Sequence, residues 1–160
     1  MLAGAERLAW GAVAHYASGV TSAPHIEALF AAALAARERA YAPYSGYRVG
    51  AALVDEGGRV FAGCNVENAA YPVGTCAEAG AVAAMAAGGS RRIAAILVLA
   101  DGPALVAPCG ACRQRIREFG IDSTPVHLAD TGGVRRTVTL GELLPLAFGP
   151  DNLAKPGEGA

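Results

Sequence analysis

One stretch of this sequence, residues 93–100, constrains the fold more than any other. It reads IAAILVLA, so it has the length of a strand and contains no polar position. Runs of this kind are typical of strands buried on both faces, whereas a half-buried strand alternates polar and apolar residues. A sheet that contains such a strand needs a covering layer on each side, so we expect an α/β fold.

The remaining elements follow from shorter patterns. Residues 47–54 and 59–64 read as two strands joined by a turn over 55–58, which together form a hairpin. Apolar residues at helical spacing, or alanine-rich runs that end at glycine, predict helices. These helices cover 26–41, 76–87, 109–119 and a brief segment over 140–147. Short strands are expected at 125–129 and 134–138. This order predicts a mixed sheet with helices on its faces.

Charge and hydropathy argue against several kinds of partner. The chain has 13 Lys and Arg against 14 Asp and Glu, a net charge of −1, which argues against nucleic-acid binding through a basic face. The sequence has no apolar run of about 18 uncharged residues, so we expect no membrane partner. Glu6, Arg7 and His15 make the first residues a poor signal peptide. We therefore expect a cytoplasmic protein.

Four cysteines, Cys64, Cys76, Cys109 and Cys112, carry the clearest chemical signal. A chain of 160 residues needs no disulfide to fold, so we expect free thiols. Cys109 and Cys112 are spaced so that two thiolates can hold one metal ion, and Cys76 offers a third. Three protein ligands and a fourth position left to water are typical of catalytic zinc, which lowers the pKa of that water to about 7. We expect one Zn²⁺ per subunit.

Glu78 stands two residues after Cys76, close enough to reach a water on the metal without binding the metal itself. It is therefore the candidate proton shuttle. Both ligand groups also lie where a helix is expected to begin, and a helix N-terminus favours the thiolate. Other interpretations stay open. Cys109 and Cys112 could be a redox pair, Cys64 could complete a closed structural zinc site, and Glu78 could only compensate a helix dipole.

A metal ligand two residues before a glutamate, followed later by P-C-x-x-C, is the zinc deaminase signature. Further motifs follow one another in a fixed order: 42–45 (APYS), 49–53 (VGAAL), 63–72 (GCNVENAAYP), 108–114 (PCGACRQ), 143–145 (LLP) and 148–150 (FGP). On these motifs the chain resembles the cytidine deaminases of the small, homotetrameric type. The resemblance covers residues 26–153.

The resemblance implies a three-layer α/β/α sandwich around a mixed sheet of about five strands. It implies a catalytic domain over residues 24–153, between a leader (1–23) of uncertain structure and a tail (154–160). The implied activity is hydrolytic deamination of free cytidine and 2′-deoxycytidine to the uridine forms and ammonia, as in pyrimidine salvage. The implied assembly is a homotetramer whose active sites are completed across subunits.

The same resemblance implies roles for single residues. Glu78 would move protons to N3 of the pyrimidine and to the leaving amino group. Backbone groups around Thr75 and Ala77 would bind that amino group and the ring carbonyl. Asn65 and Glu67 would bind the ribose 3′-hydroxyl, and their spacing of two on an extended segment places both on one face. As an alternative, Asn65 and Glu67 could be turn formers beyond the hairpin.

Three aromatic residues would complete the pocket. Tyr47 stands where the family usually has a phenylalanine against the base. Tyr71 and Phe148 match aromatic positions that build the pocket across subunit boundaries. Tyr47 and Phe148 could also be ordinary core or interface residues.

Position 79 departs from the family pattern, because many relatives have an arginine after the catalytic glutamate and this chain has Ala79. Three thiolates and one Zn²⁺ sum to a charge of −1, which such an arginine offsets. Arg113 or backbone N–H groups at the helix starts are the candidates to replace it.

Three other functions fit parts of the pattern. A deaminase of the antibiotic blasticidin S has similar motifs, although Asn65 and Glu67 favour a ribose. A deaminase of RNA or DNA usually has histidine where this chain has Cys76, and it needs a basic surface. A non-catalytic zinc protein of the same fold would not need Glu78.

Overall fold

Five strands form one mixed sheet at the centre of the structure, a computed structural model that describes residues 23–153. The strands are β1 (Gly50–Asp55), β2 (Val60–Cys64), β3 (Ile93–Leu99), β4 (Pro125–Asp130) and β5 (Gly133–Thr139). Their order across the sheet is β2-β1-β3-β4-β5. β3 and β4 run parallel, whereas the other neighbours are antiparallel. The expected β1–β2 hairpin and the mixed sheet are confirmed.

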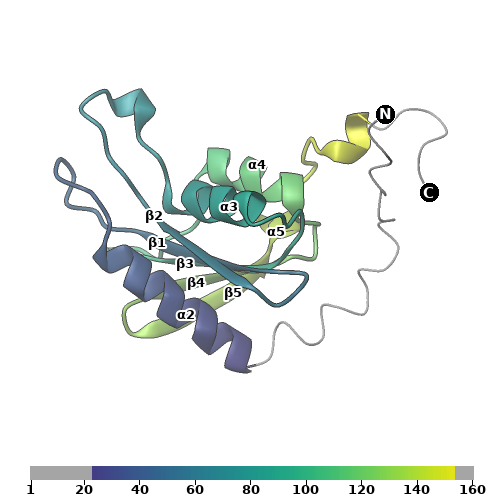
Figure 1. The fold of residues 1–160 in the computed structure, drawn as a ribbon, viewed down its shortest axis with the longest axis horizontal. Coiled ribbons are helices and arrows are strands. Elements are labelled where there is room, and N and C mark those ends of the chain that lie inside the picture. The colour runs from purple at the N-terminus through teal and green to yellow at the C-terminus, as the bar shows by residue number, and fades with distance from the viewer. Residues whose placement is uncertain (1–22, 154–160) are drawn as a thin grey trace.

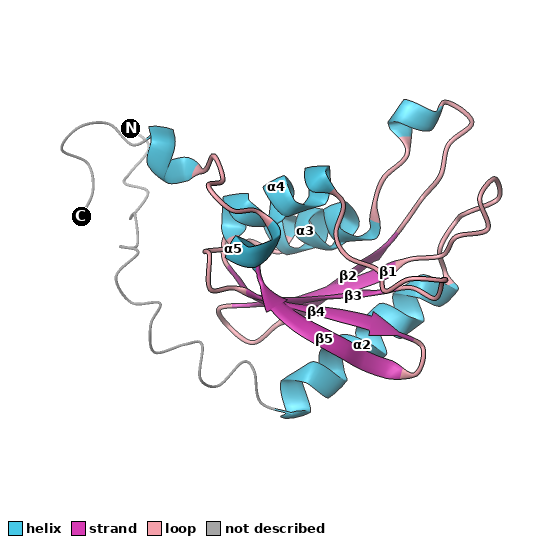
Figure 2. Ribbon diagram, turned by 180° about the vertical axis from the view of Figure 1, so that it is seen from behind, coloured by secondary structure: helices cyan, strands magenta, loops and turns pink. Residues whose placement is uncertain are grey.

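Helices cover both faces of this sheet (Figure 1). α2 (Ala23–Glu38) lies on one face, and α3 (Ala77–Ala87), α4 (Gly110–Phe119) and the short α5 (Leu140–Leu143) lie on the other, as the view from behind also shows (Figure 2). The expected three-layer α/β/α sandwich is therefore confirmed. None of the helices described between residues 23 and 153 is long and apolar enough to span a membrane.

The central strand β3 explains why the sheet needs two covering layers. Six of its seven residues are buried. Ile96 belongs to the core under α3 and α4, with Met85 and Ile116, whereas Leu97 belongs to the core under α2, with Leu29. Alternate residues of one strand thus serve two cores, and each core holds one helical layer on the sheet.

Two boundaries differ from the sequence prediction because long-range contacts decide them, and a third differs because of a nearby proline. α2 ends at Glu38 rather than at residue 41, since the backbone of Tyr41 pairs with Asn65 and Glu67. β1 begins at Gly50 rather than at residue 47, because the Asn65 side chain bonds the backbone there. α5 ends at Leu143, two residues before Pro145, which disfavours helical geometry in the residue before it. Of the predicted leader, only Ala23 lies within the described residues, and the predicted tail 154–160 lies outside them.

Gly63 lets β2 approach α3 closely, and α3 carries part of the candidate site. A Cβ at position 63 would lie 2.5 Å from the Ala77 carbonyl oxygen and 2.5 Å from the Ala81 nitrogen. Both are backbone atoms, so neither can rotate away. On the other side of the contact, a Cβ on Gly80 would meet the Gly63 Cα at an ordinary 3.5 Å.

We expect Gly63→Ala to lower the free energy of unfolding by about 3 kcal/mol, because overpacking that must move backbone is at the upper end of the usual cost. Gly80→Ala is the matched control, since it adds the same methyl group at the same contact without a clash. Urea unfolding of both variants measures the difference. Equal stability of the two variants would contradict this description of the β2–α3 contact.

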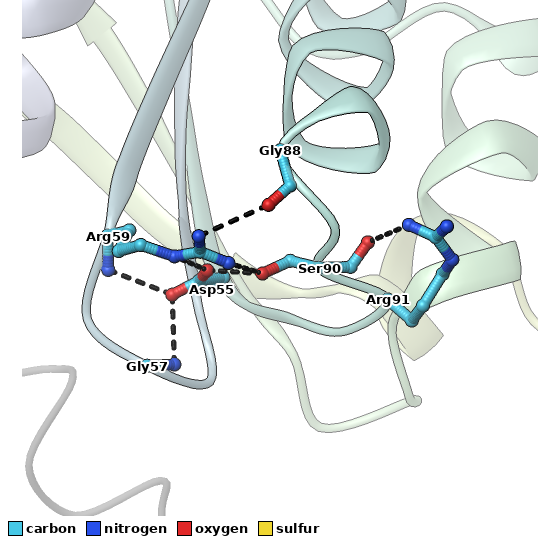
Figure 3. A network of polar contacts seen from close by, with 6 residues as sticks. All are labelled: Asp55, Gly57, Arg59, Gly88, Ser90 and Arg91. Atoms are coloured by element: carbon cyan, nitrogen blue, oxygen red, sulfur yellow. Dashed lines mark hydrogen bonds and ion pairs between the residues drawn. The ribbon is translucent and has the colours of Figure 1, made fainter. Parts of the chain in front are cut away.

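A buried carboxylate, Asp55, fixes the turn of the β1–β2 hairpin to the end of α3 (Figure 3). It accepts hydrogen bonds from the Gly57 N–H at 2.9 Å, from the Arg59 N–H and Nε at 2.8 Å each, and from the Ser90 hydroxyl. Arg59 also donates to the Gly88 carbonyl oxygen at 3.2 Å. Burial alone would raise the pKa of the Asp55 carboxyl, but the hydrogen bonds from Ser90, Arg59 and Gly57 outweigh it and hold the pKa below its usual value.

We expect Asp55→Ala to lower the free energy of unfolding by about 2 kcal/mol at neutral pH, because four donors lose their acceptor. A carboxylate whose pKa is lower in the folded state stabilises the fold at pH values above its unfolded pKa of about 3.9. That stabilisation is lost as the pH falls through the pKa of the folded state. The difference between Asp55→Ala and the parent should therefore shrink below about pH 4. Glu56→Ala, which removes an exposed carboxylate from the same turn, serves as the control.

Candidate metal and active site

Two helix N-termini bring the three predicted ligands together. Cys76 is the N-cap residue of α3, and Cys109 is the N-cap residue of α4. Cys112 lies in the first turn of α4 and is fully buried. The alanine-rich α3 begins after the extended segment that ends at Cys76, and Pro108 precedes the start of α4. Each helix therefore presents sulfur at its positive end.

The spacing of the sulfur atoms suits a zinc ion. The Sγ atoms of Cys76, Cys109 and Cys112 all lie within 4.8 Å of one another, and those of Cys76 and Cys109 are 3.9 Å apart. Tetrahedral Zn²⁺ with Zn–S bonds of about 2.3 Å places its sulfurs about 3.8 Å apart. Three thiolates are also the soft donor set that zinc prefers. These residues thus fit a zinc ion, with one coordination position left over.

The same geometry bears on two alternatives. The Cys76 sulfur lies together with the Cys109 and Cys112 sulfurs, a group of three that a redox pair does not require. Cys64 is free and ends β2, but it is absent from the metal-binding group found among residues 23–153. A closed site of four cysteines is therefore not favoured.

Without a counter-ion, the three thiols do not ionise alike. Burial raises the pKa of the Cys112 thiol, and the Glu78 charge and the other two sulfurs raise it further. Burial likewise raises the pKa of Cys76. Burial would raise the pKa of Cys109 too, but hydrogen bonds from the backbone and side chain of Cys112 lower it. A divalent cation removes this conflict, because it stabilises all three thiolates at once.

Glu78 lies in the first turn of α3, only 4% exposed. Its charge acts on the thiols of Cys76, Cys109 and Cys112, which places its carboxylate beside the group of sulfurs. The described metal-binding group does not include it. The structure thus places a buried carboxylate next to the metal ligands.

A cleft of about 510 Å³ reaches this site along the segment that precedes α3. Residues 65–75 form an arm that leaves the end of β2, projects beyond the layers and returns to Cys76, with a helical turn at Tyr71–Val73 near its tip (Figures 1 and 2). The residues that line the cleft include Tyr44, Ser45, Asn65, Glu67, Tyr71, Thr75 and Cys76. The cleft therefore extends from one metal ligand, Cys76, to the two predicted sugar-binding residues.

Asn65 and Glu67 both point to the loop that precedes β1. The Asn65 amide accepts from the Val49 N–H and donates to the Tyr47 carbonyl oxygen, each at 2.8 Å. The Glu67 carboxylate accepts from the N–H groups of Tyr44 at 2.8 Å and Ser45 at 3.2 Å, and from the Ser45 hydroxyl. Val66 between them pairs with Tyr41 and Thr75. The two side chains thus lie on one face of an extended segment, and their own chain already holds both.

The backbone at Thr75 and Ala77 forms the link between cleft and helix. Thr75 exchanges two hydrogen bonds of 2.9 Å with Val66, so its position relative to the arm is fixed. Ala77 is fully buried and is the first residue of α3. The N–H groups of a first helical turn have no acceptor within the helix, so the Ala77 N–H can donate to a ligand.

The three predicted aromatic residues have different surroundings. Tyr71 is 77% exposed, lines the cleft and packs edge-to-face with Tyr44, with ring centroids 6.0 Å apart. Tyr47 lies against Gly102, and Phe148 is 59% exposed on the segment after α5. Tyr47 and Phe148 are not among the described residues that line the cleft of the single chain.

The structure distinguishes the two candidates that could replace the missing arginine at Ala79. The Arg113 guanidinium donates to the carbonyl oxygens of Pro108 at 2.8 Å and Leu143 at 2.7 Å. It therefore connects the residue before Cys109 to the end of α5. The backbone of Cys112, in contrast, hydrogen-bonds the Cys109 sulfur. Of these two candidates, the backbone at the helix start is therefore the one that contacts a ligand sulfur, whereas these Arg113 hydrogen bonds go to carbonyl oxygens.

Ser45 is one of the cleft residues to which the sequence analysis gave no role of its own, although it lies in the 42–45 motif. Its hydroxyl contacts Glu67 and the Tyr47 N–H, and the turn that carries it closes at Gly46, whose φ is +68°. A serine next to a glycine in a turn gives only a general turn signal. Its contact with Glu67 joins residues 22 positions apart, which no local pattern reveals.

Comparison with known protein families agrees with this site. The model of the family described as "Cytidine and deoxycytidylate deaminase zinc-binding region" matches residues 24–128, a range that holds the three cysteines, Glu78, Asn65 and Glu67. The chain belongs to this family.

Individual relatives cover most of the chain. The cytidine deaminase of Sporosarcina psychrophila is 44% identical over 133 residues, which are 83% of this chain and 98% of the relative. A cytidine deaminase of Mycobacterium tuberculosis is 40% identical over 116 residues, 72% of this chain and 84% of the relative. The matched region therefore covers more than four fifths of each of these relatives.

Solved structures give the same result. The crystal structure of the cytidine deaminase from Burkholderia pseudomallei matches with a TM-score of 0.71 and 50% identity, over 76% of this chain and 98% of that one. The cytidine deaminase from Mycobacterium tuberculosis matches with a TM-score of 0.66 and 38% identity, over 77% and 96% of the two chains. The α/β fold of this family member is thus that of solved cytidine deaminases.

Proposed function

We propose that this chain is a zinc-dependent enzyme that deaminates free cytidine and 2′-deoxycytidine by hydrolysis, yielding uridine or 2′-deoxyuridine and ammonia. One observation carries the proposal. Three thiols spaced for a zinc ion and the buried carboxylate of Glu78 stand at two helix N-termini, and one of the thiols, Cys76, lines a cleft together with Asn65 and Glu67. The relatives named above are cytidine deaminases, which supports the same conclusion.

Cys76, Cys109 and Cys112 hold the metal, and Glu78 handles protons. Zinc, when bound, supplies a Lewis acid that makes water nucleophilic at neutral pH. Glu78 takes up a proton from the attacking water and delivers it to N3 of the pyrimidine. It carries a second proton to the amino group as the C4–N bond breaks. Because Glu78 is 4% exposed, bulk water does not compete with it for these protons.

Backbone groups orient the base. The Ala77 N–H, which has no acceptor within α3, donates to the ring carbonyl oxygen. The Thr75 carbonyl oxygen accepts from Val66 and keeps a second lone pair, which can accept from the leaving amino group. Tyr47 lies on the loop that Asn65 anchors, and we assign it to the side of the base.

Asn65 and Glu67 bind one sugar hydroxyl. Their existing hydrogen bonds explain why they bind a single hydroxyl group and not two. A carboxylate has about four acceptor positions, and the loop occupies three of those on Glu67. The Asn65 amide has two N–H donors, and one of them bonds Tyr47. One acceptor and one donor remain, which a 3′-hydroxyl can satisfy together.

We further infer that the sites work within a homotetramer in the cytoplasm. Tyr71 and Phe148 are 77% and 59% exposed, and the arm that carries Tyr71 projects beyond the layers of its own subunit. A neighbouring subunit that covers these aromatic side chains would bury them and close the cleft. Three free thiols at a metal site suit a reducing compartment.

A substrate panel tests the proposed function. Purified, zinc-loaded protein is incubated with cytidine, 2′-deoxycytidine, cytidine monophosphate, adenosine and blasticidin S, and products are separated by chromatography. We expect deamination of the first two and little of the others. Preference for blasticidin S, or no turnover of any compound by protein with one zinc per chain, would contradict the proposal.

A further inference from the structure

The hydroxyl group of Ser45 joins two parts of the cleft that the proposed mechanism treats separately. It donates a hydrogen bond to Oε1 of Glu67 and accepts one from the Tyr47 N–H at 2.9 Å. The sugar-binding carboxylate and the loop that carries Tyr47 therefore share one small side chain. No step of the proposed chemistry involves Ser45 directly.

The two oxygens of Glu67 are held in different ways. Oε2 accepts from two backbone N–H groups, those of Tyr44 and Ser45, which the turn fixes in place because the Gly46 N–H bonds the Ala42 carbonyl oxygen at 3.0 Å. Oε1 accepts from the Ser45 hydroxyl. Among the contacts within residues 23–153, this hydroxyl is the one partner that the structure shows for Oε1. Without this hydroxyl, the Glu67 carboxylate can rotate while Oε2 stays bound to the two N–H groups, and Oε1 is no longer fixed.

We propose that Ser45 is a positioning residue that sets the preference for substrates with a sugar 3′-hydroxyl, because it holds Glu67 in the rotation that leaves one acceptor position to that hydroxyl. The inference rests on the proposed deaminase function and names a determinant of its substrate specificity. The same contact acts on ionisation in the same direction. The Ser45 hydroxyl is the largest cause that lowers the pKa of Glu67, and it thereby keeps the acceptor charged.

The exposure of Ser45 makes the test clean. Ser45 is exposed and lies outside both hydrophobic cores, so Ser45→Ala removes a hydroxyl without opening a cavity. Ser45→Thr keeps the hydroxyl, whereas Ser45→Cys keeps the size with a weaker donor. Ser123→Ala is the matched control. It removes an exposed serine hydroxyl from the turn before β4. This turn lies at the opposite end of the strands from the cleft, because β1 starts beside the end of β3 and β4 runs parallel to β3.

The experiment compares 2′-deoxycytidine with 2′,3′-dideoxycytidine, which differ only in the 3′-hydroxyl. For Ser45→Ala we expect KM for 2′-deoxycytidine to rise about tenfold and kcat to stay within about twofold of the parent. A lost hydrogen bond to a charged group has about this effect when it stabilises the bound substrate and the transition state equally. kcat/KM for 2′,3′-dideoxycytidine should stay at the parent value. Ser45→Cys should behave like Ser45→Ala, and Ser45→Thr and Ser123→Ala like the parent.

Each other outcome has a distinct meaning. An equal loss of kcat/KM on both substrates, or no change on either, would overturn the role of Ser45. If Ser45→Ala does not fold, as judged by its melting curve, Ser45→Cys decides by the same comparison. A parent protein that deaminates both substrates equally well would also overturn the inference while leaving deamination intact. A zinc-loaded parent that deaminates neither would refute the proposed function itself.

Discussion

Glu78→Gln should abolish deamination while the protein keeps its zinc. General acid–base catalysis is worth about 10²–10⁴ in rate, and we expect a loss at or beyond the upper end because both proton transfers pass through this carboxylate. Glutamine has nearly the same size and shape, so the buried position in the first turn of α3 remains filled. The measurement is steady-state kinetics with cytidine, with zinc quantified on the same sample.

The pattern of effects distinguishes a proton shuttle from a metal ligand or a helix cap. A shuttle loses kcat, keeps about one zinc per chain and changes KM little. Glu118→Gln removes an exposed carboxylate from α4 and serves as the control, for which we expect parental activity. Full activity of Glu78→Gln would show that the carboxylate only compensates the dipole of α3.

Cys112→Ala should remove zinc and activity together. Cys112 supplies one of the three sulfurs of the metal-binding group from a fully buried position, so the variant keeps only two sulfurs, which hold zinc much less tightly. A ligand that binds only the folded state at 1,000 times its Kd adds about 4 kcal/mol of stability, and this increment should disappear in the variant. Zinc content after dialysis and thermal melts with and without added zinc measure both effects.

Cys64→Ala is the matched control for the same experiment. Cys64 ends β2 and is not part of the metal-binding group described within residues 23–153. We therefore expect this variant to keep one zinc per chain and parental activity. Loss of zinc from Cys64→Ala would instead indicate a closed site of four cysteines, which leaves no position for water.

Local patterns were enough to predict the parts of the fold that local forces decide. The apolar stretch that becomes β3 is buried on both faces, as its composition requires. Cys76 and Cys109 stand at the N-caps of their helices, as the proline and alanine patterns indicate. The sequence alone also predicted that Cys109 and Cys112 bind one metal ion, because of their spacing, with Cys76 as a candidate third ligand.

Contacts between distant residues account for most of what the sequence did not predict, the end of α5 before Pro145 being a local exception. α2 stops at Glu38 because Tyr41 pairs with the arm after β2, and that pairing competes with the helix. The Asn65 side chain replaces a strand partner over residues 47–49. Gly63 is needed because the backbone of α3 passes within 2.5 Å of where its Cβ would lie. Each of these contacts joins segments whose separation is set only by the complete fold.

The proposed function also explains how the site discriminates among substrates by chemistry rather than by charge. The formal net charge is −1, so the protein has no overall positive charge to attract a nucleic-acid backbone. The cleft instead offers one acceptor on Glu67 and one donor on Asn65. These groups suit a small neutral nucleoside whose sugar hydroxyl can both donate and accept.

The most direct test of the central claim is a product analysis with cytidine on protein of known zinc content. We expect uridine and ammonia to form in equal amounts, at a rate proportional to the fraction of chains that hold zinc, and to stop in metal-free protein until zinc is restored. Unchanged cytidine after incubation with protein that carries one zinc per chain, or equal rates with and without zinc, would contradict a zinc-dependent deaminase.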